Sequence, residues 1–205
     1  LSPLLSNIML NELDKELTSR GLPFVRYADD SMIFCKSKRA AKRVKESVTR
    51  FIEGKLHLKV NRDKTVVSYV QGVKYLGYSF YVMKGKCQLT VHPKAKSRMK
   101  AKLKELTSRS NGWGYAKRKQ KLEEYIRGWV GYYHLANMKR FLMKTDEWLR
   151  RRLRMCIWKS WKRVKTRIAN LIKCGIDKYQ AYMWGNSRLG DWRIAGSYIL
   201  SRAIT

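Results

Sequence analysis

Two adjacent carboxylates, Asp29 and Asp30, stand between two short apolar segments and are the residues best suited to chemistry. Segments 23–27 (PFVRY) and 31–35 (SMIFC) have the pattern of strands, so we expect the carboxylates at the tip of a hairpin. Carboxylate oxygens bind Mg²⁺ together with substrate phosphates. Two such ions support nucleotidyl transfer by activating a hydroxyl and neutralising the leaving pyrophosphate. The simpler alternative is that aspartate merely suits a turn.

The elements that would position this hairpin belong to an α+β region. Apolar residues recur at helical spacing from Leu4 to Leu17. A second helix is expected after a Ser37 cap, with an apolar stripe formed by Ala41, Val44, Val48, Phe51 and Ile52. Segments 56–60 and 66–70 have strand patterns, and segments 75–82 and 88–91 predict a hairpin that turns at residues 84–86. We therefore expect a domain over residues 1–92 with a mostly antiparallel sheet.

After Pro93 the pattern becomes helical, which predicts an all-α domain over residues 93–205. Met99, Leu103 and Leu106 mark one helix face. Six apolar or aromatic residues mark one face of a second helix: Leu122, Tyr125, Ile126, Trp129, Val130 and Tyr133. Thr145 is expected to cap a third helix, which turns inward the residues Leu149, Leu153, Ile157, Trp161 and Val164. A fourth helix is expected over about 177–187.

The chain is strongly basic, with 46 Lys+Arg against 15 Asp+Glu and a net charge of +31 over 205 residues. Residues 1–92 carry 17 basic against 8 acidic side chains (+9), and residues 93–205 carry 29 against 7 (+22). This surplus indicates a polyanionic partner, and nucleic acid is the first candidate. A membrane partner is not expected, because no apolar run approaches the roughly 18–20 residues of a membrane-spanning helix. The four cysteines are widely spaced, which indicates neither a zinc site nor a disulfide framework.

The strongest basic run lies on the expected third helix and just beyond it. We predict that it contacts RNA phosphates through nine residues: Arg150, Arg151, Arg152, Arg154, Lys159, Lys162, Arg163, Lys165 and Arg167. A solvated helix face is the plainer interpretation. Tryptophans interleave with these cations at positions 148, 158, 161, 184 and 192. Hydrophobic core is the favoured role for each of them, and stacking on unpaired bases is the alternative.

The tetrapeptide Tyr-Ala-Asp-Asp at 27–30 resembles the catalytic motif of reverse transcriptases, and the surrounding blocks resemble the group II intron members of that family. Segments 1–8 (LSPLLSNI), 58–65 (LKVNRDKT) and 75–78 (YLGY) are similar to successive polymerase blocks. Segments 127–133 (RGWVGYY), 146–154 (DEWLRRRLR) and 190–195 (GDWRIA) are similar to the thumb, or maturase X domain. The blocks occur in the family's order, and the resemblance extends over essentially the whole chain.

The resemblance implies roles for individual residues. Asp29 and Asp30 would hold Mg²⁺ in a two-metal site, and Lys64 would donate a proton to departing pyrophosphate, with a solvated lysine as the alternative. A further set would contact the primer and template: Tyr27, Ala28, Tyr75, Leu76, Gly77 and Tyr78. Core packing and an ordinary hairpin are the alternatives for these residues.

The family's fold implies that residues 1–92 are the carboxyl-terminal part of a polymerase palm and residues 93–205 are the thumb. The implied function is an RNA-directed DNA polymerase that also binds group II intron RNA to assist splicing. Its partners would be intron RNA, RNA template with DNA primer, and dNTP. The alternatives are a non-catalytic RNA-binding splicing factor and an unrelated basic RNA-binding protein. The implied compartment is the bacterial cytoplasm, with an organelle as the alternative.

The chain opens on Leu1 inside an expected helix, and we expect it to be a fragment. The family's first catalytic aspartate belongs to an earlier palm strand, and neither Asp14 nor Asp63 matches its place. We therefore expect that this chain alone does not polymerise. Its incomplete sheet would leave an apolar face, which predicts self-association or pairing with a separately supplied upstream half.

Overall fold

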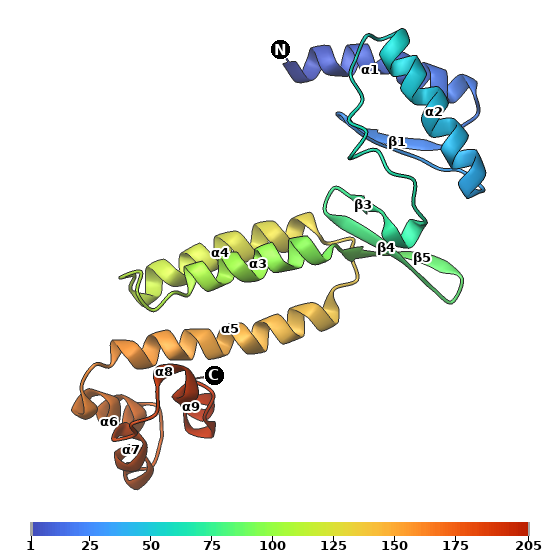
Figure 1. Cartoon of the computed structure of the whole chain (residues 1–205). Helices are drawn as coiled ribbons and strands as arrows, with labels where there is room; N and C mark the ends of the chain where they lie inside the picture. Colours follow the sequence, from blue (N-terminus) through green and yellow to red (C-terminus); the bar gives the residue numbers. More distant parts are fainter. Residues whose placement is uncertain (1, 205) are drawn as a thin grey trace. The chain divides into compact units, whose positions relative to one another are not determined.

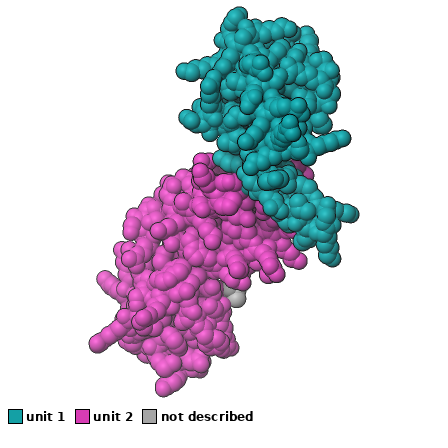
Figure 2. Space-filling view, turned by 45° about the vertical axis from the view of Figure 1, so that its right-hand side comes forward, with its two compact units in different colours: residues 1–89 teal, residues 90–205 magenta. Residues whose placement is uncertain are grey.

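The structure is a computed structural model that describes residues 2–204, and it combines helices with small antiparallel sheets (Figure 1). This confirms the expected mixture of α and β structure. The chain divides into two compact units, residues 1–89 and residues 90–205, which Figure 2 colours separately. Their identities as palm and thumb stay predictions. Among residues 2–204 no helix is both long enough and apolar enough to cross a bilayer.

The first unit packs two helices on one face of a hairpin. Helix α1 (Ser2–Ser19) and helix α2 (Lys38–Gly54) flank strands β1 (Phe24–Tyr27) and β2 (Asp30–Ile33). Leu13 and Leu17 of α1 are buried in a core that also takes side chains from α2 and from both strands, namely Val44, Val48, Phe51, Ile52, Phe24 and Ile33. The amphipathic stripe predicted for α2 is therefore the stripe that it buries.

Helix α2 begins where the sequence predicted. The Ser37 hydroxyl accepts a hydrogen bond from the Ala40 amide at 3.1 Å, which satisfies one of the free amides of the first turn. The helix ends at Gly54. Ser37 follows β2 closely, so this cap fixes the point at which the chain leaves the hairpin and turns back across the core.

A second sheet has the order β3-β4-β5, formed by β3 (Lys74–Tyr75), β4 (Tyr78–Met83) and β5 (Lys86–Val91). The predicted hairpin between the last two strands is confirmed, with its turn at Lys84 and Gly85. Both turn residues have positive φ, 51° and 73°, as a type I′ hairpin turn requires. The prediction of one strand over 75–82 was wrong, because the chain reverses at Leu76 and Gly77.

Two predicted strands are absent from the structure. Segments 56–60 and 66–70 are irregular, apart from a short 3₁₀ turn, η1, at Val70–Gly72. Both segments have apolar residues in a strand pattern, yet Val66 and Tyr69 are largely exposed. A strand needs a neighbour for its backbone hydrogen bonds, and no strand of the described sheets pairs with either segment. An apolar pattern alone was therefore not sufficient to predict a strand at these two segments.

The second unit begins with three long helices, α3 (Pro93–Leu106), α4 (Tyr115–Tyr132) and α5 (Lys139–Ser160). The predicted face of α3 is confirmed, since Met99, Leu103 and Leu106 are buried in one cluster. No role was predicted for His92, but its Nδ1 accepts a hydrogen bond from the Lys94 amide at 3.1 Å and caps α3. The same cluster takes Leu122 from α4 and Leu149 from α5.

Four shorter helices follow, α6 (Val164–Lys173), α7 (Lys178–Gly185), α8 (Asp191–Ile194) and α9 (Tyr198–Ala203). They close a second core around Trp158, which is only 1% exposed, with Leu171, Ala181 and Leu200 among its neighbours. Asp177 caps α7 by accepting from the Tyr179 and Gln180 amides. The predicted fourth helix is thus confirmed, but the shorter helices on either side of it were not predicted.

Two details of the predicted third helix were wrong. Thr145 lies inside α5, where its hydroxyl donates to the Phe141 carbonyl at 2.7 Å, because Phe141 and Leu142 pack on the core and extend the helix toward its start. At the other end α5 stops at Ser160, and the Trp161 carbonyl accepts from Arg167 Nε at 3.1 Å. Val164 is exposed rather than inward-facing.

Candidate functional site

Asp29 occupies the tip of the β1–β2 hairpin. Tyr27 pairs with Asp30 across the strands, so only Ala28 and Asp29 form the loop. Ala28 has φ of +52°, a left-handed conformation that costs a residue with a Cβ roughly 1–2 kcal/mol. The predicted hairpin is confirmed, and its turn is held in a conformation that the alanine does not itself prefer.

The two aspartates are open to solvent. Both are exposed, and neither takes part in an ion pair within residues 2–204. Side chains alternate between the faces of a strand, so Tyr27 and Asp30 share the face that lies opposite the helix-covered core, and Tyr27 is 64% exposed. Asp29 and Asp30 are therefore not part of a buried ion cluster among the described residues.

The donor set at the tip fits part of a magnesium site. Two neighbouring carboxylates are the hard oxygen ligands that Mg²⁺ takes, and Mg²⁺ commonly uses one or two carboxylates with substrate phosphates. Among the described residues no group of three His, Cys, Asp or Glu side chains comes together as a metal site. Asp29 and Asp30 would therefore supply part of the ligand set, and without further ligands they would hold an ion only weakly.

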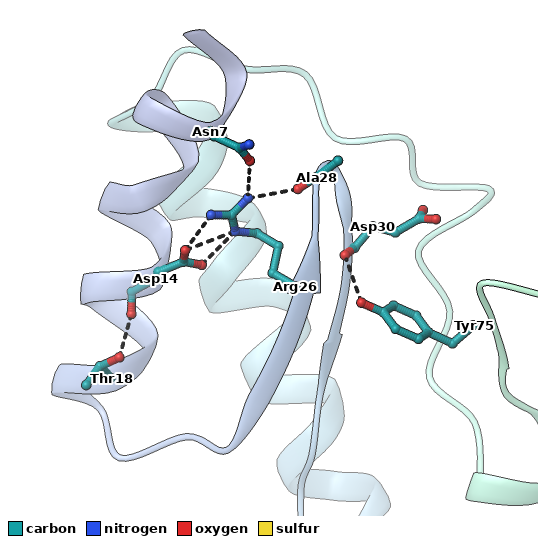
Figure 3. A network of polar contacts seen from close by, with 7 residues as sticks. All are labelled: Asn7, Asp14, Thr18, Arg26, Ala28, Asp30 and Tyr75. Atoms are coloured by element: carbon teal, nitrogen blue, oxygen red, sulfur yellow. Dashed lines mark hydrogen bonds and ion pairs between the residues drawn. The ribbon is translucent and has the colours of Figure 1, made fainter. Parts of the chain in front are cut away.

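Arg26 connects the hairpin to helix α1, as Figure 3 shows. Its Nε and Nη2 atoms bond to the Asp14 carboxylate at 2.8 and 2.5 Å. Its Nη1 atom donates to Asn7 Oδ1 at 2.9 Å and to the Ala28 carbonyl at 3.0 Å. The hydrogen bond to Asp14 raises the pKa of Arg26. This network was not predicted, because 12 positions separate Arg26 from Asp14 in the chain.

Tyr75 lies beside the second aspartate. Its hydroxyl donates to the Asp30 carbonyl at 3.5 Å, a long hydrogen bond that is also drawn in Figure 3. Burial raises the pKa of Tyr75, and the neighbouring charge of Asp30 raises it further. Leu76 and Gly77 form the adjacent two-residue turn with φ of 50° and 81°, and Tyr75 pairs with Tyr78. The structure thus brings Tyr75, a predicted primer contact, to the backbone of one candidate metal ligand.

Lys64 is exposed on a turn organised by Asn61. The Lys64 amide donates to Asn61 Oδ1 at 3.1 Å, and the Thr65 hydroxyl donates to the Asn61 carbonyl at 2.8 Å. The Lys45 ammonium bonds to the Thr65 carbonyl. These contacts fix the backbone of the turn, but no bond joins the Lys64 side chain to Asp29 or Asp30. Its role as a proton donor stays a prediction.

The predicted RNA-binding cations fall into two groups. Five are exposed: Arg150, Lys159, Lys162, Arg163 and Lys165. Four of these lie between the end of α5 and the first turn of α6, where Arg163 precedes an amino terminus that no side chain caps. Uncapped amides and the helix dipole favour anions at such a terminus. We call residues 159–165 the junction.

The other cations are directed into the fold. Arg152 donates to the Thr107 hydroxyl at 2.5 Å and to the Lys104 and Thr107 carbonyls at 3.1 and 3.0 Å. Arg151 donates to the Trp192 carbonyl and lies 4.2 Å over that ring. Desolvation lowers the pKa of Arg152 and of Arg154. Arg167 stacks on Trp158 at 4.7 Å. These contacts indicate structural roles that charge alone did not predict.

The exposed aromatic side chains differ from those that the sequence emphasised. Trp158 is buried, and positions 148, 161 and 184 are half-buried against the two cores, as their favoured interpretation holds. Trp192 is 39% exposed beneath Arg151. Tyr179 and Tyr182 of α7 are 77% and 51% exposed and lie three positions apart, on one helix face. Their spacing in the sequence was the signal that could have found them.

Comparison with known proteins agrees with both halves of the chain. Residues 1–80 match the family model for reverse transcriptase (RNA-dependent DNA polymerase). Residues 96–175 match the model for the group II intron, maturase-specific domain. Protein YkfC of Escherichia coli K12 is 31% identical over 113 residues, covering 38% of this chain and 30% of that protein. Group II intron-encoded protein LtrA of Lactococcus lactis subsp. cremoris is 37% identical over 67 residues, covering 32% of this chain and 11% of that protein.

One unit carries a hairpin with paired carboxylates and the other carries most of the positive charge, and this combination suits a protein that binds nucleic acid. The two matched domains then give the family: the chain belongs to the group II intron reverse transcriptases with a maturase domain. The chain spans less than a third of the length of the curated relatives it matches.

Proposed function

We propose that this chain is part of an RNA-directed DNA polymerase encoded by a group II intron, and that it also binds the intron RNA. The observation that supports the catalytic part best is the exposed Asp29–Asp30 pair at a two-residue hairpin tip, free of ion pairs among the described residues. A carboxylate pair kept in water and away from cations is available to a divalent ion. The matched domains provide the family context.

The residues of the hairpin would serve the reaction by holding and orienting its participants. When bound, Mg²⁺ would neutralise phosphate charge and lower the pKa of the attacking 3′-hydroxyl. Asp29 and Asp30 would hold that ion, and Tyr27 lies on the same open sheet face as Asp30. Tyr75 and the Leu76–Gly77 turn would position the primer end from the Asp30 side. Lys64 would donate a proton to pyrophosphate if the substrate brings the two together.

The chain by itself should not polymerise, since the resemblance calls for a further metal-binding aspartate that none of its residues matches. Removing a ligand of a two-metal site should cost several kcal/mol of transition-state stabilisation. The test is primer extension on an RNA template with dNTP and Mg²⁺ by the purified 205 residues. No extension is expected. Extension that Asp29→Ala abolishes would contradict this part of the proposal.

The second unit would supply most of the RNA affinity, because it holds most of the positive charge. Exposed cations of the junction offer phosphate contacts without sequence preference. Binding of the chain to group II intron RNA, measured by filter retention across a salt series, should weaken steeply as salt rises. Affinity that does not change with salt would contradict phosphate contact as its source.

A non-catalytic splicing factor that keeps the polymerase fold is the competing function. The exposed carboxylate pair argues against it, since RNA binding alone gains nothing from negative charge at a hairpin tip. We further propose that the apolar face of α1, with Leu4, Leu5 and Ile8 exposed, pairs with an upstream half of the enzyme or with a second copy of the chain. Sedimentation as a monomer at all concentrations would exclude the second of these partners.

A further inference from the structure

We propose that Arg26 is the positioning residue of the hairpin tip: it fixes the Ala28–Asp29 turn to helix α1 and so sets where the Asp29 carboxylate stands. The inference rests on the proposed metal-binding role of Asp29, and it adds a residue that the family resemblance did not assign. Four observations support it: the guanidinium hydrogen bonds, the burial of the ion pair, the backbone conformation of the turn and the strand register.

The guanidinium uses three of its nitrogens on three separate acceptors. Two of them form a fork with the Asp14 carboxylate at 2.8 and 2.5 Å. The third reaches both Asn7 Oδ1 and the Ala28 carbonyl. Only arginine presents several donors in one rigid plane. The bond to Ala28 therefore holds the turn at a point that α1 determines (Figure 3).

The Arg26–Asp14 pair is partly shielded from water. The side chains of Arg26 and Asp14 are 13% and 25% exposed, whereas most ion pairs of this chain join more exposed partners. A charge-assisted bidentate pair in such surroundings keeps a narrow geometry. Arg26 also points to the covered face of the hairpin, because it alternates with the exposed Val25 and Tyr27. We call Arg26 with its bonds to Asp14, Asn7 and Ala28 the Arg26 clamp. It holds the turn from the face of the hairpin opposite the one that carries Asp30.

The turn needs such a clamp because of its backbone. Ala28 has φ of +52°, which residues with a Cβ adopt rarely. A two-residue loop with that residue is held in place when its carbonyl has a fixed donor. Arg26 supplies this donor from only two positions away while it is itself anchored on another element. Loss of the donor frees Ala28 to relax, and the direction of the Asp29 side chain changes with it.

The test uses the 205-residue chain and compares Arg26 with a matched arginine. Arg20 also donates from two guanidinium nitrogens to a carboxylate of α1, both to Glu16 Oε1, at 2.9 and 2.6 Å. It also donates to Ser47 of α2, and no hydrogen bond joins it to the hairpin. Arg26→Lys, Arg26→Gln and Arg20→Gln are each examined for amide exchange at positions 28–30 and for Mn²⁺ binding. Thermal denaturation shows how much of each effect is general destabilisation.

We expect exchange of the Asp30 amide, which belongs to the Tyr27–Asp30 strand pair, to rise at least tenfold in Arg26→Gln and somewhat less in Arg26→Lys. Mn²⁺ affinity at the tip, followed by paramagnetic broadening of the Asp29 and Asp30 amides, should fall about fivefold. Arg20→Gln should leave both readouts within twofold of the parent chain. Equal effects of Arg20→Gln and Arg26→Gln, or unchanged exchange in Arg26→Gln, would overturn the inference.

The two proposals fail in different ways. Asp29→Ala should abolish the Mn²⁺ broadening without altering the Arg26–Asp14 pair. If the parent chain shows no Mn²⁺ broadening at all, metal binding by this chain is contradicted, while the exchange measurement still decides whether Arg26 holds the turn. If the broadening is present but does not change in Arg26→Gln, the proposal of metal binding at Asp29 is supported. The proposal that Arg26 positions the Asp29 carboxylate is then contradicted.

Discussion

The Arg152 guanidinium and the Thr107 hydroxyl lie 2.5 Å apart, which joins the middle of helix α5 to the end of helix α3. The same guanidinium donates to two carbonyls at that end, those of Lys104 and Thr107. The last carbonyls of a helix have no partner within it. Arg152 therefore serves as a cap delivered from another helix, although its place in a basic run pointed to RNA.

This relationship predicts that Arg152 and Arg163 respond differently to substitution. Arg152→Gln should lower the free energy of unfolding by about 2–3 kcal/mol, because it leaves buried carbonyls without their charged donor. Arg163→Gln should change stability by less than about 0.5 kcal/mol, since the side chain is exposed. Denaturant titration followed by tryptophan fluorescence measures both. Equal losses for the two variants would refute the distinction.

RNA affinity should depend on the junction cations. Neutralising Lys162 and Arg163 together should weaken binding to any RNA and reduce the slope of log affinity against log salt by about 2. The slope is measured by titration at several salt concentrations. Arg151→Gln serves as the control, because that guanidinium lies over Trp192 inside the fold. A larger loss of slope in the control than in the junction variant would contradict the assignment.

The exposed tyrosines of α7 should contribute through stacking. Tyr179→Ala and Tyr182→Ala should each weaken binding to single-stranded RNA by about 1 kcal/mol and leave the salt slope unchanged. Both side chains are more than half exposed, so the melting temperature should stay within about 1 °C. Tyr125→Ala is the contrasting variant, because Tyr125 packs on the core and its loss should lower stability. Affinity unaffected by either exposed tyrosine would exclude stacking at this face.

The contact between helices α6 and α7 leaves no room for a side chain at Gly185. A Cβ built at Gly185 would lie 2.5 Å from the Ile168 side chain, so Gly185→Ala should destabilise the chain by about 1–3 kcal/mol. Gly128 of α4 is the matched control, because nothing lies within 4 Å of a Cβ there. Gly128→Ala should be neutral or stabilising by up to about 1 kcal/mol. Thermal denaturation of the two variants should therefore give shifts of opposite or clearly unequal size.

The parts of the fold that the sequence predicted are those determined by local rules. The Ser37 cap, the apolar stripe of α2 and the buried face of α3 each follow from residues within one or two helical turns. Segments 56–60 and 66–70 show the limit of such rules, because a strand also needs a partner that may lie anywhere along the chain. Thr145 shows another limit, since a hydroxyl can bond back to Phe141 as readily as it can cap.

The candidate site likewise has features that local sequence predicts and features that depend on tertiary packing. Adjacent aspartates between two strand patterns were enough to predict the hairpin and its exposed carboxylates. The clamp could not be predicted, because Asn7, Asp14 and Arg26 meet only through the packing of α1 on the hairpin. The division of the basic run into surface and interior cations was equally hidden, since charge does not reveal which guanidiniums meet a carbonyl.

The account as a whole depends on Asp29 as a metal-holding carboxylate of a reverse transcriptase. The most direct measurement is Mg²⁺-dependent primer extension on an RNA template by an intact reverse transcriptase that carries residues 1–205. Asp29→Asn should reduce extension at least about 1,000-fold, while Asp63→Asn, at another exposed turn of the same unit, should stay within threefold of the parent enzyme. Near-normal extension by Asp29→Asn, or an equal loss in Asp63→Asn, would contradict the account.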